Sequence, residues 1–247
     1  MKYMGSKRRI AKQIAPFINS FHADVYVEPF VGGFNITPFI EKPVIFASDV
    51  NSGLIELYQS LQAGWLPPEL VTEKMYTDIK NNKQNYPLEI VTYVGYALSF
   101  GGKYFGGYRR DKAGDNSSEN EENQSRRAYT SLLKQIESKQ FKIATFTCLN
   151  YFDSVNFTSS FGYKKPFVVY CDPPYSGTTG YRLKFNHNKF WGWVREVSLE
   201  NYVVVSEYEA PKDFDVLWEG KIPNTLNKDG GLTATEKLFI WKRGLNV

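Results

Sequence analysis

Residues 171–175 read Cys-Asp-Pro-Pro-Tyr and follow an apolar run at 167–170, which predicts a buried strand that ends at this point. A strand that ends at Asp172 directs its carboxylate into the crevice beyond the carboxyl ends of an open α/β sheet. The Asp172 carboxylate and the Pro173 carbonyl can accept the two hydrogens of an amino group on a flat ring, on which Tyr175 can stack. The pattern indicates a pocket that prepares an exocyclic amine for alkylation. The structural alternative is a proline-capped strand end with a surface aspartate.

A second group of residues predicts a nucleotide site. The run at 25–28 leads into a corner that closes in Gly32 and Gly33, where the chain leaves room for a ligand to approach the backbone. The run at 44–48 ends at Asp49, 17 positions past Gly32. That spacing is close to the roughly 20 residues at which an acid meets ribose hydroxyls. A lone glycine pair is more often an ordinary turn, but a glycine corner followed by a strand that ends in an acid favours nucleotide binding.

These segments occur in an order that resembles a known family, the Dam-type or D12 class of adenine-specific DNA methyltransferases. The similarity extends along nearly the whole chain. Its motifs are Lys2-Tyr3-Met4-Gly5-Ser6-Lys7, Glu28-Pro29-Phe30-Val31-Gly32, Ser48-Asp49-Val50-Asn51-Ser52 and Asp172-Pro173-Pro174-Tyr175, with weaker similarity at Tyr151-Phe152-Asp153 and at Glu236-Lys237-Leu238-Phe239-Ile240-Trp241.

The resemblance implies S-adenosylmethionine as cofactor, double-stranded DNA as substrate, and direct methyl transfer to adenine N6 after the target base has left the duplex. It implies that Tyr3 and Lys7 help to hold the cofactor, that Asp49 binds its ribose, and that Asp172 serves both the cofactor and the target amine. The implied catalytic residues are Asp172, Pro173, Pro174 and Tyr175, and the implied cofactor-binding residues are Tyr3, Lys7, Glu28, Phe30, Gly32, Gly33, Phe34, Asn35, Asp49, Asn51, Phe152, Asp153 and Asp172.

One position departs from the family pattern. The family motif of Phe, any residue, Gly, any residue, Gly meets Phe34 where its second glycine belongs. Gly33 is expected to supply the missing backbone freedom one position early.

The order of elements predicts a doubly wound, Rossmann-like α/β sheet of the methyltransferase type. Strand-like runs lie at 25–28, 44–48, 143–147, 167–171, 202–206 and 237–242, with helices expected between them, a helix from Ser6 to Ile18 capped by Ser6, and Asn51 or Ser52 capping the next helix. Residues 63–138 lack a strand pattern and predict an inserted, mainly helical target-recognition domain. The predicted domains are therefore 1–62 and 139–247 for catalysis and 63–138 for recognition.

A loop in this insert predicts contact with DNA. Residues 100–110 space aromatic and basic side chains with paired glycines, and the predicted DNA-binding residues are Lys103, Tyr104, Tyr108, Arg109 and Arg110. Aromatic rings can stack on bases, and arginine can bind a guanine edge or a phosphate. We expect one of the two arginines to read a base and the other to bind a phosphate. The acidic stretch at 111–124 has no aromatic residue and is expected to be disordered without DNA.

Composition limits the class of protein. The 247 residues carry a net charge of +4, which suits an anionic partner, and no stretch is apolar enough for a membrane span. Cys148 and Cys171 both lie in apolar runs, which predicts two buried thiols in a reducing compartment. His22 and His187 are isolated, so no metal site is expected. We expect a cytoplasmic protein of a bacterial or phage-infected cell, a monomer or weak dimer, with a role in DNA methylation such as restriction-modification.

Other interpretations stay open. Cytosine N4 methylation uses the same amine chemistry, and a binding-only protein could retain the fold. Protein glutamine methyltransferases typically begin the tetrapeptide with Asn, where this chain has Asp172. Ser206-Glu207-Tyr208 is expected to be either a strand end facing the crevice or a helix cap, and 227–235 is expected to form a hairpin turn.

Overall fold

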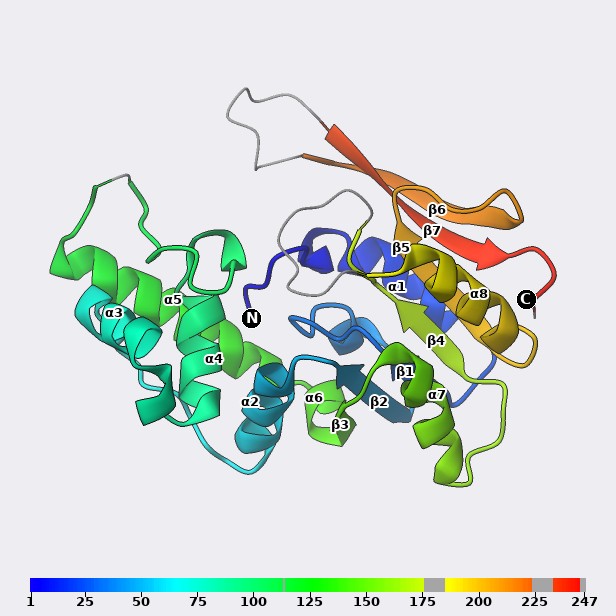
Figure 1. The fold of residues 1–247 in the computed structure, drawn as a ribbon, viewed down its shortest axis with the longest axis horizontal. Helices are drawn as coiled ribbons and strands as arrows, with labels where there is room; N and C mark the ends of the chain where they lie inside the picture. Colours follow the sequence, from blue (N-terminus) through cyan, green and yellow to red (C-terminus); the bar gives the residue numbers. More distant parts are fainter. Residues whose placement is uncertain (113, 176–184, 224–232, 245–247) are drawn as a thin grey trace. The chain divides into compact units, whose positions relative to one another are not determined.

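The computed structural model describes residues 1–112, 114–175, 185–223 and 233–244 (Figure 1). Within them the strands form one seven-stranded sheet in the order β3-β2-β1-β4-β5-β7-β6. The chain divides into two compact units. The first comprises Met1–Lys7, Gly32–Pro38 and Asp49–Cys148, and the second comprises Arg8–Val31, Phe39–Ser48 and Leu149–Val247.

Parallel strands form the centre of the second unit. β1 (Val25–Glu28) pairs with β2 (Val44–Asp49) on one side and with β4 (Val168–Cys171) on the other, and β4 pairs with β5 (Tyr202–Glu207). Every residue of β1 and β4 is buried, as expected for parallel strands covered on both faces. The strand order reverses between β1 and β4, which makes this pair the topological switch point where open α/β sheets bind ligands.

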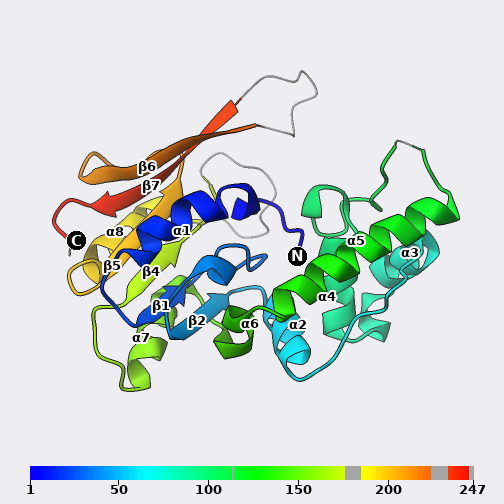
Figure 2. The same ribbon diagram turned by 180° about the vertical axis from the view of Figure 1, so that it is seen from behind.

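Helices cover both faces of this part of the sheet. α7 (Tyr151–Ser160) and α8 (His187–Val197) contribute Val155, Phe190 and Val194 to a core with Val169 and Val205 of the strands. α1 (Ala11–Asn19) lies on the opposite face, as the two views show (Figures 1 and 2). The prediction of a doubly wound α/β sheet is confirmed.

The last two strands run against the others. β7 (Thr233–Trp241) pairs antiparallel with β5, and β6 (Phe214–Pro223) pairs antiparallel with β7. A helix was expected between the strand-like runs at 202–206 and 237–242, and for the residues of β6 this expectation is wrong. A register shift between Val216 and Trp218 interrupts the apolar-polar alternation that identifies a half-buried strand. The hairpin turn predicted at 227–235 lies mainly outside the described residues.

Two further expectations about helices need correction. β1 and β2 are joined by a 3₁₀ turn at Thr37–Phe39 where a helix was expected. A 3₁₀ turn at Lys7–Arg9 also precedes α1, and the residue before α1, Ile10, makes no side-chain cap, so Ser6 does not cap this helix. Asn51 does cap the next helix, α2 (Ser52–Gln62), because its side chain accepts a hydrogen bond from the Gly53 amide.

The first unit is mainly helical. Beside α2 it contains α3 (Glu73–Asn81), α4 (Leu88–Ala97), α5 (Ser118–Ile136), α6 (Lys139–Ile143) and β3 (Ala144–Cys148), with 3₁₀ turns at Lys83–Asn85 and Phe100–Gly102. The helical character expected for 63–138 is therefore present.

The expectation of disorder at 111–124 is wrong, because α5 begins within it. The Ser117 side chain accepts a hydrogen bond from the Asn120 amide, and Glu119 and Glu121 lie in the first turn, where their charge interacts favourably with the helix dipole. Asn120 and Gln124 are buried. The acidic residues thus lie at the start of a helix. Composition alone does not distinguish such a helix start from a disordered segment.

The two cysteines differ in environment. Cys171 is buried at the end of β4, but Cys148 is exposed at the end of β3, so the prediction of two buried thiols is wrong for Cys148. Alternation places Cys148 on the same face as the buried Ala144 and Phe146, yet this last residue of β3 is exposed. No helix among the described residues is long and apolar enough to cross a bilayer.

Candidate active site

Three acidic residues follow or end the parallel strands at one edge of the sheet. Glu28 ends β1, Asp172 follows β4, and Glu207 ends β5. Because the three strands are parallel neighbours, their carboxyl ends lie at the same edge. Glu28 and Glu207 are buried, whereas Asp172 is partly exposed. Of the three, Asp172 is thus the most exposed carboxylate, and its contact with a ligand stays a prediction.

The Tyr175 side chain is held by hydrogen bonds. Its hydroxyl donates to Glu236 Oε2 at 2.5 Å and lies 3.0 Å from Ser206 Oγ. Its half-buried ring packs edge-on against Tyr208, with ring centroids 4.6 Å apart. Burial, and then the charges of Asp172 and Glu236, raise the pKa of Tyr175 well above its usual value, so the hydroxyl stays protonated. Ser206 lies in β5, so the helix-cap alternative for residues 206–208 is wrong.

Two buried tyrosines accompany the acids at this edge. The Tyr26 hydroxyl donates to Glu28 Oε2 at 3.1 Å, and burial followed by the Glu28 charge raises the pKa of Tyr26. Burial likewise raises the pKa of Tyr170. Both hydroxyls therefore stay neutral at pH 7. Among the described residues, no group of three or more His, Cys, Asp or Glu side chains is arranged to hold a metal ion.

Aromatic rings lie beside this edge in the second unit. Phe30 stacks on Tyr151 with centroids 5.5 Å apart, and Tyr151 stacks on Phe152 at 4.2 Å. Asp153 is exposed, and its carboxylate accepts a hydrogen bond of 2.7 Å from Asn150 Nδ2 while its amide donates to Asn150 Oδ1. These bonds to the N-cap residue Asn150 account for Asp153 by the start of α7.

Asp49 organises the glycine corner in the first unit. Its Oδ2 accepts from the Gly32 amide at 3.0 Å, and its Oδ1 accepts from the Asn51 amide at 2.9 Å. Burial raises the pKa of Asp49, and the backbone amides oppose this rise. Asn51 Nδ2 donates to the Tyr96 hydroxyl at 2.7 Å, and burial raises the pKa of Tyr96 to about 12. Tyr96 was not predicted, because it lies in the apolar pattern of α4.

Tyr3 packs closely against the same corner. Its ring centroid lies 4.9 Å from that of Tyr96, and a Cβ added at Gly32 would come within 2.9 Å of the Tyr3 ring. A Cβ at Gly33 would lie 2.4 Å from Asn35 Nδ2 and 2.8 Å from Tyr3 Cβ. Glycine is thus required at both positions for close packing. Lys7, a further residue of the predicted set, is buried with an exposed fraction of 5%.

The structure corrects the expectation that Gly33 supplies the backbone freedom missing at Phe34. Gly32 has a φ of +44°, and Phe34 itself adopts the left-handed conformation with a φ of +53°. The Phe34 ring is 1% exposed and packs among Tyr58, Phe141 and Phe146. Phe34 therefore adopts the strained backbone conformation that glycine adopts easily, and its side chain anchors the loop in a core.

Gln135 holds the carbonyl groups of this loop. Its Nε2 donates to the Gly33 and Phe34 carbonyls, both at 2.8 Å, and its side chain is buried. Gln135 lies in α5, about a hundred residues further along the chain, so no local pattern indicates this contact. The glycine corner is thus supported by a residue that the sequence does not reveal.

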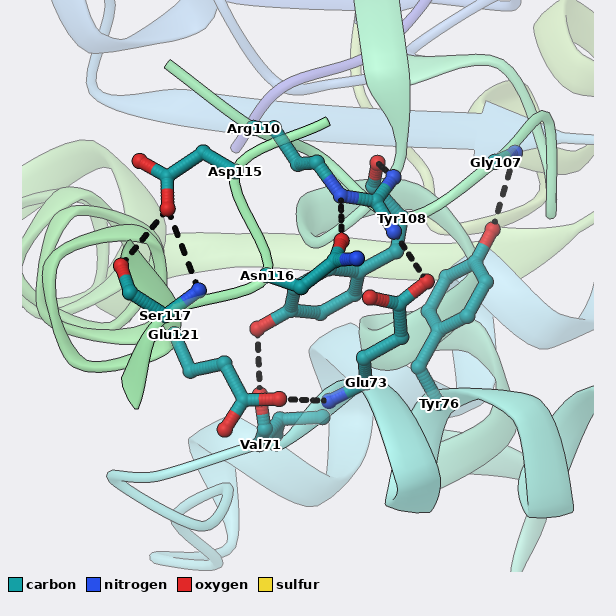
Figure 3. Close-up of polar contacts among 10 residues, drawn as sticks. All are labelled: Val71, Glu73, Tyr76, Gly107, Tyr108, Arg110, Asp115, Asn116, Ser117 and Glu121. Atoms are coloured by element: carbon teal, nitrogen blue, oxygen red, sulfur yellow. Dashed lines mark hydrogen bonds and ion pairs between the residues drawn. The ribbon is translucent and has the colours of Figure 1, made fainter. Parts of the chain in front are cut away.

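Figure 3 shows Tyr108, a residue of the predicted DNA-binding loop. Tyr108 is buried, with an exposed fraction of 5%. Its hydroxyl donates to the Val71 carbonyl at 2.7 Å, and the neighbouring Gly107 amide donates to the Tyr76 hydroxyl at 3.2 Å. The prediction that Tyr108 contacts DNA is therefore corrected: its ring anchors the loop. Tyr104 is 38% exposed, and Lys103 is exposed as well.

The two adjacent arginines have different environments. Arg110 forms an ion pair with Glu73 and donates to Asn116 Oδ1 at 2.8 Å (Figure 3). Arg109 is half-buried, and burial, followed by the charge of Arg127, lowers its pKa. No carboxylate among the described residues forms a salt bridge with Arg109. Arg110 thus stabilises the loop, and Arg109 is the better candidate for a DNA contact.

Comparison with known families bears on these residues. A family model described as D12 class N6 adenine-specific DNA methyltransferase matches residues 3–163, well over half of the chain. The chain belongs to this family. The matched segment includes the glycine corner and Asp49, and the Asp172 tetrapeptide follows it.

Known relatives give further context. The chain is 25% identical over 223 residues to the type II methyltransferase M.FokI of Planomicrobium okeanokoites, covering 81% of this chain and 32% of M.FokI. It thus spans about a third of that relative. Two structures of the rRNA methyltransferase aviRa from Streptomyces viridochromogenes align with TM-scores of 0.46 and 0.45 at 12% identity, over 98% of this chain and 87% of theirs.

Proposed function

We propose that this protein transfers a methyl group from S-adenosylmethionine to adenine N6 in double-stranded DNA. Membership of the D12 class family carries this proposal. The position of Asp172 at the carboxyl end of β4, beside the switch point of the sheet, supports it. The similarity to M.FokI, a type II methyltransferase, supports a place in a restriction-modification system.

Asp172, Pro173 and Tyr175 would act on the target base. The lone pair of adenine N6 is delocalised into the ring, which makes the amine a poor nucleophile. Hydrogen bonds from its two N–H groups to the Asp172 carboxylate and the Pro173 carbonyl favour a more tetrahedral nitrogen. Tyr175 would stack on the flipped base and offset the cost of extruding it, a few kcal/mol. The nitrogen gains the methyl group and loses one proton, so no covalent enzyme intermediate is required.

The glycine corner and Asp49 fit the proposed cofactor. When bound, S-adenosylmethionine supplies an electrophilic methyl group. The Asp49 carboxylate accepts the Gly32 and Asn51 amides and has further acceptor capacity, which suits ribose hydroxyls. Gly32 and Gly33, whose Cβ atoms would clash with Tyr3, keep the backbone close and without side chains.

The proposed DNA contacts come from the loop at 100–112. Lys103 and Tyr104 are exposed and Arg109 is half-buried, so these three side chains are proposed to contact DNA. Arg110 and Tyr108 would act by holding the loop in shape. The predicted recognition domain at 63–138 remains part of this proposal.

The decisive experiment is incubation of the full chain with methyl-labelled S-adenosylmethionine and unmethylated genomic DNA, followed by nucleoside analysis. We expect label in N6-methyladenine, and Asp172→Ala should abolish incorporation while circular dichroism shows an intact fold. Asp172→Asn is the matched control for charge, because it retains one acceptor oxygen. Label in N4-methylcytosine would establish the cytosine alternative, and cofactor binding without any label in DNA would establish a binding-only protein.

A further inference from the structure

Glu236 lies in β7 with its side chain directed at Tyr175. Its exposed fraction is 6%, and its Oε2 accepts the Tyr175 hydroxyl at 2.5 Å. Hydroxyl donors to carboxylates give hydrogen bonds of about 2.5–2.7 Å, which are roughly twice as strong as neutral ones. A buried carboxylate is costly unless it is bonded, so the Tyr175 hydroxyl and the Glu236 carboxylate stabilise each other.

The pairing of β5 with β7 explains why these groups meet. Ser206 is opposite Leu238 and Glu207 is opposite Lys237, so the next position places Glu236 opposite Tyr208. Side chains two positions apart in a strand share a face, which puts Glu236 on the face of Leu238 and therefore of Ser206. The Tyr175 hydroxyl lies 3.0 Å from Ser206 Oγ, and its ring contacts Tyr208. Residues from two neighbouring strands thus surround one ring.

The direction of the hydrogen bonds follows from the number of protons. A tyrosine hydroxyl has one proton, which it donates to Glu236, so it accepts the proton of the Ser206 hydroxyl. This chain of hydrogen bonds fixes the far end of the Tyr175 side chain. Pro173 and Pro174 restrict the backbone immediately before it. The ring is therefore constrained at both ends.

We propose that Glu236 is a positioning residue that sets the plane of the Tyr175 ring to receive the flipped base. This inference rests on the proposed function and deepens it. A ring already held in position stacks on an incoming base without losing further rotamer freedom, and small displacements of positioning groups can cost about 100-fold in rate. Glu236 acts through Tyr175 and has no role in binding the cofactor.

The test is a double-mutant cycle with Glu236→Gln, Tyr175→Phe and the combined variant. The readouts are kcat and KM for DNA, the fluorescence of 2-aminopurine at the target position, and the affinity for S-adenosylmethionine. We expect Tyr175→Phe to lower kcat about 10- to 100-fold with reduced 2-aminopurine fluorescence and unchanged cofactor affinity. Glu236→Gln, which keeps an acceptor oxygen, should lower kcat less, and the combined variant should be no worse than Tyr175→Phe alone.

Glu219 provides the matched control, because it is an exposed glutamate on the adjacent strand β6. Glu219→Gln should leave all readouts unchanged. Additive losses in the cycle, or unchanged kcat and fluorescence in Tyr175→Phe, would overturn the inference while wild-type methylation upholds the proposed function. A wild-type protein that methylates no DNA would overturn both. If a variant fails to fold, the remaining single variant and its fluorescence still decide the question.

Discussion

Replacing Phe34 by glycine and by alanine should separate two opposing effects at one position. Phe34 is 1% exposed in an aromatic core, yet its φ of +53° lies in the left-handed region. Both replacements remove the ring. Only glycine also relieves the backbone strain.

The magnitudes decide the sign of the difference. Removing a buried phenylalanine ring costs about 3–5 kcal/mol of unfolding free energy. A left-handed conformation costs a residue with a Cβ about 1–2 kcal/mol, and Phe34→Gly is relieved of this strain. Glycine is also more flexible in the unfolded chain, which lowers the stability of Phe34→Gly by about 0.4–1 kcal/mol relative to Phe34→Ala. We therefore expect Phe34→Gly to be about 0.5–1 kcal/mol more stable than Phe34→Ala, although both are far less stable than the wild type.

Phe141 supplies the matched control. It packs edge-on against Phe34 and is equally buried, but it lies in α6 with helical backbone, where glycine is about 1 kcal/mol worse than alanine. Urea unfolding of the four variants, compared at equal m-values, measures both differences. The glycine variant should be the more stable of its pair at position 34 and the less stable at position 141. The same sign at both positions would refute the assignment of strain to Phe34.

Four further outcomes are expected. Asp49→Ala should weaken S-adenosylmethionine binding by about 1–3 kcal/mol, and unaltered affinity in calorimetry would assign the ribose contact to another residue. Gln135→Leu leaves two loop carbonyls without its amide and should lower the unfolding free energy by about 1–3 kcal/mol in urea; an unchanged midpoint would contradict this. Arg109→Ala should raise KM for DNA and reduce the salt dependence of DNA binding, whereas Arg110→Ala should mainly lower Tm. Equal effects of the two variants on KM would contradict the assignment of DNA contact to Arg109 and of loop stability to Arg110. Bidentate hydrogen bonds from Arg195 hold the pKa of Asp213 well below its usual range. This pair stabilises the fold by at most about 1 kcal/mol, because it is largely exposed; the stabilisation is present above about pH 4 and is lost as the pH falls through the lowered pKa. The stability of Asp213→Asn should therefore approach that of the wild type in acid, and parallel pH profiles of the two proteins would rule this out.

The parts of the fold and site that were predictable have local causes. The continuous apolar runs of β1 and β4 identify buried parallel strands, because both faces of such strands are covered. The Asn51 cap is a hydrogen bond to an amide two residues away. The expectation that Asp49 binds a ribose rested on its spacing from the glycine corner and stays a prediction; the structure adds a hydrogen bond from the Gly32 amide to its carboxylate.

The errors concern residues whose partners lie far along the chain or whose pattern is interrupted. In the sequence Tyr108 is indistinguishable from an exposed stacking residue, but in the structure its hydroxyl donates a hydrogen bond to the Val71 carbonyl. Similarly, the sequence suggests Arg110 as a phosphate ligand, and the structure shows that it forms an ion pair with Glu73. Charged and aromatic residues can each form several kinds of contact, and the packing of the helices determines which of these contacts form within the protein.

By itself, then, the sequence determined the parallel strands β1, β2, β4 and β5, the motifs of the family and the tetrapeptide that follows β4, since each consists of residues close together in the chain. Only the tertiary structure decided that Phe34 adopts a left-handed conformation in an aromatic core, that Gln135 holds the glycine corner, and that Glu236 bonds to Tyr175. These last contacts join residues separated by 61 to 102 positions. Their partners are chosen by strand register and helix packing, which arise only when the chain has closed its long loops and buried its core.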